Sequence, residues 1–329
     1  MKIAVVGATG LVGREMLTVL AERGFGDAEV IAAASPKSVG KEIDFAGRRL
    51  TVTSVDDAIA QRPQYAIFSA GAAASREYAP RFAAAGTTVI DNISAWRKDP
   101  DIPLVVPEIN INAVKESDRI IANPNCSTIQ MVLAISALQR EYGIRRLVIA
   151  TYQSITGTGI KAVRQLEAEE QGITPTERAY VNPIHRNLFP HGGDFQSDGY
   201  TTEEQKLVDE TRKIFGDPSI QITATVVRVP VVGGHSEAVN VELRRDYDLD
   251  EVRRLIADTP GVILYDDPAT NRYPMPILSH HRDEVWVGRL RRDFSQPNSL
   301  NLWVVADNIR KGAATNAIQI MEGLLGDRR

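Results

Sequence analysis

The sequence predicts an α/β protein of two domains: a Rossmann-like dinucleotide-binding domain, and a second α+β domain built on a mixed β-sheet. Three observations favour this fold class. The first third alternates short apolar runs with amphipathic segments, and a glycine-rich turn joins the first strand to the first helix. Beyond residue 126, long runs of β-forming residues replace this alternation. A chain of 329 residues is also long for a single hydrophobic core.

Five apolar runs in the first domain are expected to form a parallel sheet covered by helices on both faces. They are Lys2–Gly7, Glu29–Ser35, Tyr65–Ala70, Thr87–Asn92 and Arg119–Asn123, with helices expected over Leu11–Gly24 and Ala74–Gly86. The first domain is predicted to comprise residues 1–125 together with a C-terminal helix in residues 307–329 that packs back on it.

The second domain, residues 126–306, begins with a helix expected over Ser127–Gly143. Its β-rich runs alternate apolar and polar residues, which predicts a sheet with one face against helices and one face free for another role. A capping box starts a later helix, as Thr201 with Glu204 or as Thr202 with Gln205. The strands are expected at Arg145–Ser154, Ile220–Val231, Glu237–Asp246, Glu284–Asp293 and Ser299–Asn308, the helices at Gly159–Gly172, Thr201–Gly216 and Leu249–Gly261, and a long loop at Thr174–Gly199.

Composition describes an ordinary globular protein, with 43% hydrophobic and 24% charged residues. A net charge of -4 provides no basic field, so neither nucleic acid nor an anionic membrane is expected as a partner. The single cysteine excludes an internal disulfide and a cysteine-rich zinc site. No signal-like segment precedes the first strand and no long apolar stretch follows it, so a cytoplasmic enzyme or binding protein that acts on small molecules is expected.

The segment GATGLVG places Gly7, Gly10 and Gly13 between the first strand and the first helix. In that context glycines let backbone N–H groups approach a pyrophosphate, and the positive end of the helix adds attraction. The alternative is a tight turn that binds no ligand.

The second strand ends with Ser35, followed by Lys37 and Ser38. An NAD site usually has Asp or Glu here to hold the ribose hydroxyls, whereas two hydroxyls and a cation suit a 2′-phosphate. The sequence therefore favours NADP over NAD, the alternative being a solvated polar turn.

Cys126 lies in NPNCST, at the expected start of a helix. Pro124 ends the preceding strand, and Asn123 or Asn125 can cap the helix. The unpaired N–H groups and the dipole of a helix N-terminus favour a thiolate. This placement favours a nucleophile over a small side chain in a core.

His235 follows a Gly-Gly turn and precedes an alternating strand, which favours a position facing a cleft over a surface turn. Arg228 lies in the apolar run just before it, and a buried guanidinium suits a carboxylate ligand or a structural ion pair. His280 and His281 have no carboxylate and cysteine cluster near them in sequence. They are therefore assigned to the surface, and no metal site is predicted.

Six motifs occur in an order that resembles the aspartate-β-semialdehyde dehydrogenase family over essentially the whole chain: GATGLVG, NPNCST, YQSITGTG, GYTTEEQK, VRVPVVGGHSE and DNIRKGAATNA. The resemblance implies an NADP-dependent enzyme that interconverts 4-phospho-L-aspartate with L-aspartate 4-semialdehyde and phosphate. It implies a role in the biosynthesis of lysine, threonine, methionine and diaminopimelate. It also implies a homodimer built on the β-rich domain, with a tetramer as a further assembly.

The resemblance also assigns residues. Cys126 becomes the nucleophile that carries a thioester and His235 the acid–base residue, while Gln153 positions the acyl group and Asn125 adjoins the nucleophile. Arg228 is expected to bind the substrate carboxylate, Glu203 its ammonium, and Lys206 and Arg97 the phosphate. Cofactor contacts are expected at Gly7, Thr9, Gly10, Leu11, Val12, Gly13, Ser35, Lys37, Ser38, Gly157 and Asn308.

Two other functions are weighed against this one. N-acetyl-γ-glutamyl-phosphate reductase shares the chemistry, but its motif reads Asn-Pro-Gly-Cys and its acetylated substrate has no use for Glu203. A catalytically silent relative would be expected to lose Cys126 or His235, and both are present. Many members of the resembled family have arginine at the position of Lys37, and lysine lacks the planar fork that grips a phosphate.

Overall fold

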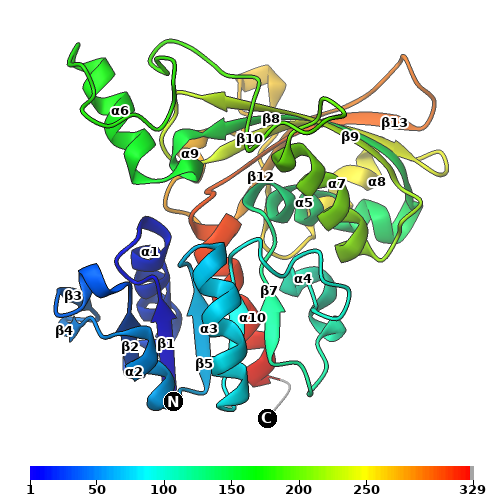
Figure 1. The fold of residues 1–329 in the computed structure, drawn as a ribbon. Helices are drawn as coiled ribbons and strands as arrows, with labels where there is room; N and C mark the ends of the chain where they lie inside the picture. Colours follow the sequence, from blue (N-terminus) through cyan, green and yellow to red (C-terminus); the bar gives the residue numbers. More distant parts are fainter. Residues whose placement is uncertain (327–329) are drawn as a thin grey trace. The chain divides into compact units, whose positions relative to one another are not determined.

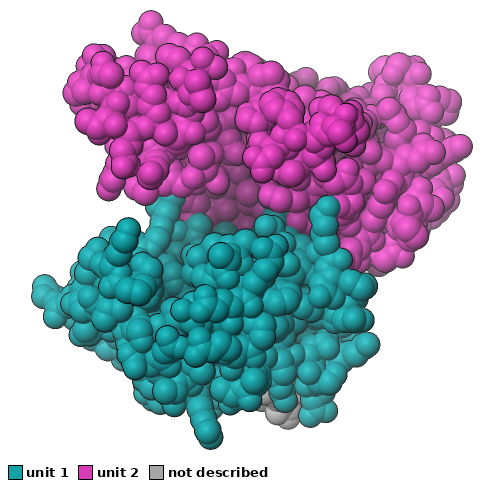
Figure 2. All heavy atoms as spheres, in the orientation of Figure 1, with its two compact units in different colours: residues 1–125, 313–329 teal, residues 126–312 magenta. Residues whose placement is uncertain are grey.

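In the computed structural model, which describes residues 1–326, a parallel sheet of five strands forms the centre of the first of two compact units (Figures 1 and 2). The strand order is β2-β1-β5-β6-β7, and every neighbouring pair is parallel. The five apolar runs thus form the expected strands: β1 (Lys2–Val6), β2 (Glu29–Ala33), β5 (Tyr65–Phe68), β6 (Thr88–Asp91) and β7 (Ile120–Ala122).

Helices cover both faces of this sheet, because alternate residues of each strand point to opposite sides. On one face Ile3 and Val5 of β1 join a core with α1 (Leu11–Leu20) and α10 (Thr315–Gly326). On the other face Ala4 and Val6 join a second core with α2 (Val55–Ala60) and α3 (Ala72–Ala84). The two-sided cover predicted from the apolar strands is confirmed.

Several local features of the first unit were not predicted. The helix expected to reach Gly24 is α-helical only to Leu20 and then widens into a π turn, Ala21–Phe25, in which Gly24 has a φ of 86°. A hairpin follows β2, and short helices follow β6. These elements are β3 (Glu42–Phe45), β4 (Arg48–Thr51), α4 (Pro107–Asn110) and the 3-10 turns Pro36–Ser38 and Ile111–Ala113.

A mixed sheet of six strands forms the second unit, in the order β11-β12-β13-β10-β8-β9. The two pairs at its edges are parallel and the three pairs between them are antiparallel. Its strands are β8 (Ile144–Ser154), β9 (Gln221–Val229), β10 (His235–Leu243), β11 (Val262–Leu264), β12 (Val285–Arg292) and β13 (Ser299–Ala306).

One face of this sheet packs against α5 (Cys126–Tyr142), α7 (Thr202–Phe215) and α8 (Leu249–Ala257), as Figure 1 shows. The opposite face presents side chains such as Tyr152 and Trp303, whose ring centroids are 5.4 Å apart. The alternating pattern of the sequence is thereby explained. Two helices complete the unit, α6 (Ile160–Glu170) and α9 (Pro276–Ser279), with 3-10 turns at Ile155–Thr158 and Pro268–Thr270.

The start of α7 distinguishes the two capping boxes that the sequence allowed. The hydroxyl of Thr201 accepts the N–H of Glu204, and the carboxylate of Glu204 accepts the N–H of Thr201. The polar segment Thr174–Gly199 is the predicted long loop, since it contains no helix or strand beyond isolated bridges at Phe189 and Phe195.

The two compact units divide after Asn125 and again after Gly312. The sequence placed this second boundary earlier, before residue 307. The difference arises because Asp307 and Arg310 follow β13 and bond to the turn ahead of β12. A π turn, Arg310–Ala314, then leads into α10. The predicted first domain also includes residues 327–329, which lie outside the described residues.

Candidate active site

The glycine-rich turn after β1 depends on two glycines for close backbone packing. Gly7 has a φ of +90°, and a Cβ there would lie 2.3 Å from the carbonyl oxygen of Ser69. A Cβ on Gly13 would lie 2.1 Å from the carbonyl oxygen of Gly7. A side chain at either position would therefore displace backbone, which is the arrangement expected where the chain approaches a pyrophosphate.

A pocket of about 350 Å³ opens beside this turn within the first unit. Of the predicted cofactor residues, four line it: Gly7, Thr9, Gly10 and Ser35. Because the bare backbone of the turn forms one wall, the residues present fit a dinucleotide. The other lining residues are Val6, Ala34, Pro36, Ser54, Val55, Asp56, Ser69, Ala70, Ala74 and Tyr78.

The remaining predicted cofactor residues of this unit do not line the pocket. Leu11, Val12 and Gly13 belong to the first turn of α1. The side chain of Lys37 is exposed, and Ser38 is buried with its hydroxyl 3.5 Å from that of Thr9.

The second strand has no carboxylate at its end, as the sequence indicated, but Asp56 brings one to the pocket. It enters the pocket from α2, a helix that the sequence did not predict. Its carboxylate pairs with Arg81 at 2.5 Å, so part of its charge is balanced. Looking for a carboxylate at the end of the second strand could not find Asp56, because it lies some twenty positions further along the sequence.

Cys126 is the first residue of α5, as the placement of NPNCST predicted. Its side chain is partly buried, and Gly312 packs so closely that a Cβ there would lie 2.8 Å from the Cβ of Cys126. Asn125 directly precedes it and is buried. The thiol thus lies at a helix N-terminus, where the backbone dipoles favour negative charge.

His235 is fully buried at the start of β10. Its Nδ1 accepts a hydrogen bond of 3.0 Å from the backbone N–H of Ser154, so the neutral ring has its proton on Nε2. Burial, and secondarily the charge of Arg228, lower the pKa of His235 to about 3. The ring is therefore a neutral hydrogen-bond donor at physiological pH. Its Nε2 faces Gly157, where an added Cβ would lie 3.2 Å away.

Gln153 connects the cysteine helix to the strand beside His235. Its Nε2 donates to the hydroxyl of Ser127 at 2.9 Å, and Gln130 donates to the backbone carbonyl of His235 at 3.2 Å. Neither Ser127 nor Gln130 was singled out in the sequence. They lie three residues apart on the helix that Cys126 begins, so they share one face, and this spacing is the signal that could have found them.

Arg228 and Glu203 lie near His235, since the charges of both act on its pKa. The guanidinium of Arg228 donates to the carbonyl of Ser154 at 2.8 Å, and the carboxylate of Glu203 pairs with Lys206 at 2.7 Å on one helix face. A Cβ on Gly192, in the long loop, would lie 3.7 Å from the Arg228 guanidinium and 3.6 Å from Glu203. The second unit thus brings together a buried imidazole, a cation and an anion, and it also contains the thiol of Cys126.

Comparison with known proteins identifies the family. A model of the semialdehyde dehydrogenase NAD-binding domain matches residues 2–117, and one of the semialdehyde dehydrogenase dimerisation domain matches residues 135–311. An aspartate-semialdehyde dehydrogenase from Aquifex aeolicus is 48% identical, with 98% of each chain covered. The chain belongs to the aspartate-semialdehyde dehydrogenase family. A relative of the same name from Legionella pneumophila is also 48% identical, with 98% of this chain and 95% of the relative covered.

A solved structure in the aspartate-semialdehyde dehydrogenase family shows the same fold. The crystal structure of aspartate semialdehyde dehydrogenase II from Vibrio cholerae, complexed with ASA, is 44% identical over 99% of this chain and 98% of that one, with a TM-score of 0.95. The oxidoreductase class, the nicotinamide dinucleotide cofactor and the place in aspartate-family amino-acid biosynthesis follow from these relatives.

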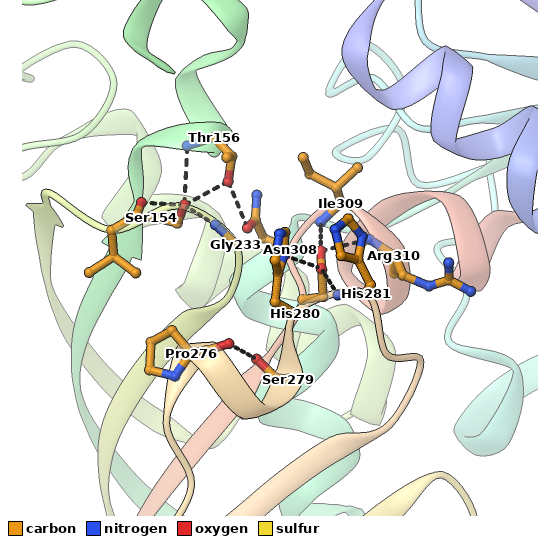
Figure 3. Close-up of polar contacts among 12 residues, drawn as sticks. Ser154, Thr156, Gly233, Pro276, Ser279, His280, His281, Asn308, Ile309 and Arg310 are labelled. Carbon is orange, nitrogen blue, oxygen red and sulfur yellow. Dashed lines mark hydrogen bonds and ion pairs between the residues drawn. The ribbon is translucent and has the colours of Figure 1, made fainter. Parts of the chain in front are cut away.

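Three further residues that the family resemblance assigned do not line the pocket of the first unit. Arg97, in the first unit, is buried and donates to the carbonyl of Asn92 at 2.8 Å. Gly157 and Asn308, both expected at the cofactor, belong to the second unit, where Asn308 accepts the hydroxyl of Thr156 at 2.9 Å (Figure 3). Their contact with a cofactor stays a prediction.

Glu237 was missed, although it lies two residues after His235 on the same face of β10. The side chain is fully buried, and neither carboxyl oxygen has a hydrogen-bond partner in residues 1–326. Burial raises its pKa well above the usual range, and the neighbouring Gln130 and Ser127 offset this only in part. Because every second residue of a strand shares a face, its spacing of two from His235 was the signal that could have found Glu237.

The assignment of His280 and His281 to a surface without a carboxylate is wrong in one respect. The carboxylate of Asp307 accepts the N–H of His281 at 2.8 Å and lies 3.2 Å from Nδ1 of His280. It comes from the end of β13, so proximity along the sequence could not reveal it. Within residues 1–326, no helix has the length and hydropathy needed to cross a bilayer, and a cytoplasmic location stays a prediction.

Proposed function

We propose that this chain catalyses the reversible NADP-dependent conversion of L-aspartate 4-semialdehyde and phosphate to 4-phospho-L-aspartate, with Cys126 as nucleophile and His235 as acid–base residue. The observation that supports it best is the link between the two residues. The helix that Cys126 begins is tied to the β8–β10 pair through Ser127 and Gln153, and the same pair holds the His235 ring by Nδ1.

In the oxidative direction, Sγ of Cys126 attacks the aldehyde carbon, and the carbonyl electrons move to its oxygen. Nε2–H of His235 donates a hydrogen bond to that oxygen, where negative charge develops. As the carbonyl re-forms, hydride leaves the same carbon and a thioester remains on Cys126; a bound nicotinamide would supply the hydride acceptor. A phosphate oxygen then attacks the thioester carbon, and the C–S electron pair returns to Cys126. In the biosynthetic direction each step reverses.

Substrate recognition is proposed for the charged groups around His235. The planar guanidinium of Arg228 suits the α-carboxylate, and Glu203 suits the ammonium group. Lys206 pairs with Glu203 and is proposed to turn its ammonium toward phosphate, together with Arg97. Gln153 and Asn125 are proposed to hold the acyl group next to the nucleophile.

The choice of NADP over NAD is proposed from the exposed Ser35 and Lys37 at the pocket. A lysine attracts a 2′-phosphate as a point charge. Asp56 opposes that attraction, but its ion pair with Arg81 reduces the repulsion.

A homodimer is proposed through the helix-free face of the second sheet, with a tetramer as a further assembly. The face presents Tyr152, 37% exposed, against Trp303, and the matching family model is a dimerisation domain. Trp303→Asp should shift the purified chain to monomer in sedimentation analysis, whereas an unchanged mass would place the interface elsewhere.

The activity itself is tested by following absorbance of the reduced cofactor. Purified protein should form NADPH from aspartate semialdehyde, phosphate and NADP⁺, with little turnover when phosphate is omitted. Parallel reactions with NAD⁺ measure cofactor preference. No absorbance change in the complete mixture would contradict the proposed function.

A further inference from the structure

His280, His281 and Asp307 form a cluster of three side chains that the proposed reaction does not use. His280 and His281 lie in the turn after α9, and Asp307 follows β13. Each offers one metal-ligating atom, and the three atoms lie within 4.8 Å of one another. Among residues 1–326 this is the one group of three or more such side chains with that spacing.

The separation of two of these atoms already matches a metal site. Nδ1 of His280 and Oδ2 of Asp307 are 3.2 Å apart. Two ligands bound tetrahedrally to zinc at 2.0–2.1 Å are about 3.3 Å from each other. An ion in place of the shared proton would therefore reach both atoms with little movement of either side chain.

The Asp307 carboxylate is held in place by backbone donors. Its Oδ1 accepts the N–H groups of Ile309 and Arg310 at 2.8 and 3.1 Å, and its Oδ2 accepts that of His281 at 2.8 Å. The Asp307 side chain is 3% exposed. Such fixed orientation of a ligating carboxylate by outer hydrogen bonds is typical of metal centres.

The two imidazoles are also fixed, and solvent can reach them. Their ring centroids are 3.8 Å apart, and His281 has a φ of 60°, a conformation that few non-glycine residues adopt. The His280 ring packs on Gly233, where a Cβ would lie 2.0 Å from Nδ1. His281 is exposed and His280 partly so, which opens the cluster to ions from solution.

We propose that His280, His281 and Asp307 bind a divalent transition-metal ion of the zinc class. Two imidazoles and one carboxylate suit Zn²⁺, Co²⁺ or Ni²⁺, whereas Mg²⁺ and Ca²⁺ prefer sets of oxygen ligands. Three protein ligands leave further coordination positions to water.

Zinc binding is tested on the full chain carrying Cys126→Ala, because the thiol is a competing ligand. Competition against a chromophoric chelator should show one bound Zn²⁺ per chain in this background. Adding His281→Asn should weaken binding by at least about tenfold, since one ligand is lost. Asparagine suits this position because it tolerates positive φ. His185→Asn, which removes an imidazole outside the cluster, should leave the affinity unchanged.

Two further measurements distinguish the loss of a metal ligand from misfolding of the variant. Zn²⁺ should raise the melting temperature of the Cys126→Ala protein but not that of the double variant that also carries His281→Asn. Without metal, the two proteins should have the same melting temperature. Co²⁺ should give visible absorption bands that only proteins with intact His281 show. Equal zinc affinity with and without His281→Asn, or no zinc binding by the Cys126→Ala protein, would overturn the proposal.

Discussion

The backbone N–H of Ser154 donates a 3.0 Å hydrogen bond to Nδ1 of His235. This bond fixes which ring nitrogen faces the Gly157 turn, and it leaves the neutral ring with its proton on Nε2. The carbonyl of the same residue, Ser154, accepts the guanidinium of Arg228. One peptide segment thus orients both the proposed acid–base residue and the proposed carboxylate ligand.

Replacing His235 by glutamine should lower kcat about 10²- to 10⁴-fold, the usual contribution of a positioned acid or base. The change removes the Nε2–H that faces the reacting oxygen, while glutamine still fills much of the buried space. Steady-state kinetics in both directions measures the loss. A matched control is His185→Gln in the loop, which should keep wild-type rates, and a His235→Gln enzyme with full kcat would remove His235 from the mechanism.

Cys126→Ala should lower turnover at least about 10³-fold, because no other thiol is available to form the thioester. NADP⁺ affinity, measured by fluorescence quenching, should stay within about twofold of wild type. Residual turnover near the wild-type rate would mean that catalysis does not proceed through Cys126.

Arg228→Lys should reduce kcat/KM for the semialdehyde about 10- to 100-fold, mainly through KM, since lysine keeps the charge but loses the bidentate fork. Arg164→Lys on the exposed side of α6 provides the matched control. Equal KM values for the two variants would show that Arg228 serves the fold and not the substrate carboxylate.

Lys37→Ala should raise the KM for NADP⁺ about tenfold and leave that for NAD⁺ unchanged, because only NADP has the 2′-phosphate. Lys37→Arg should lower the KM for NADP⁺, since its fork can bind the phosphate with two donors. The exposed Lys41→Ala is the control. If all three variants keep the wild-type ratio of NADP⁺ to NAD⁺, Lys37 does not contact the 2′-phosphate.

Glu237→Gln should make the fold more stable, by an amount that grows with pH. Burial holds the folded-state pKa of this carboxyl well above its ordinary value of 4.5, so between these two values the unfolded chain loses a proton that the native state keeps. Wild-type stability therefore falls as pH rises through that window. Denaturant unfolding at about pH 5 and about pH 8 measures the difference. If the difference in unfolding free energy between variant and wild type shrinks toward alkaline pH, Glu237 is ionised in the folded protein.

Local sequence determined much of this protein. The apolar runs form parallel strands, because residues buried on both faces must be apolar throughout. Gly13 permits the tight turn after β1 because a Cβ there would meet the carbonyl oxygen of Gly7, six positions earlier. Cys126 begins a helix, since Pro124 ends the strand before it. Each of these conclusions depends on residues within a few positions of one another.

Contacts between distant residues were decided only by the tertiary structure. Ser154 meets His235 because β8 pairs with β10, although 81 positions separate the two residues. Asp56 reaches the cofactor pocket on an unpredicted helix, and Asp307 reaches His280 from the end of β13. Periodicity specifies which face a side chain occupies, but strand order and register specify its partner. The reacting groups proposed here were thus predicted from the sequence, and the packing of the sheets decided how they are held.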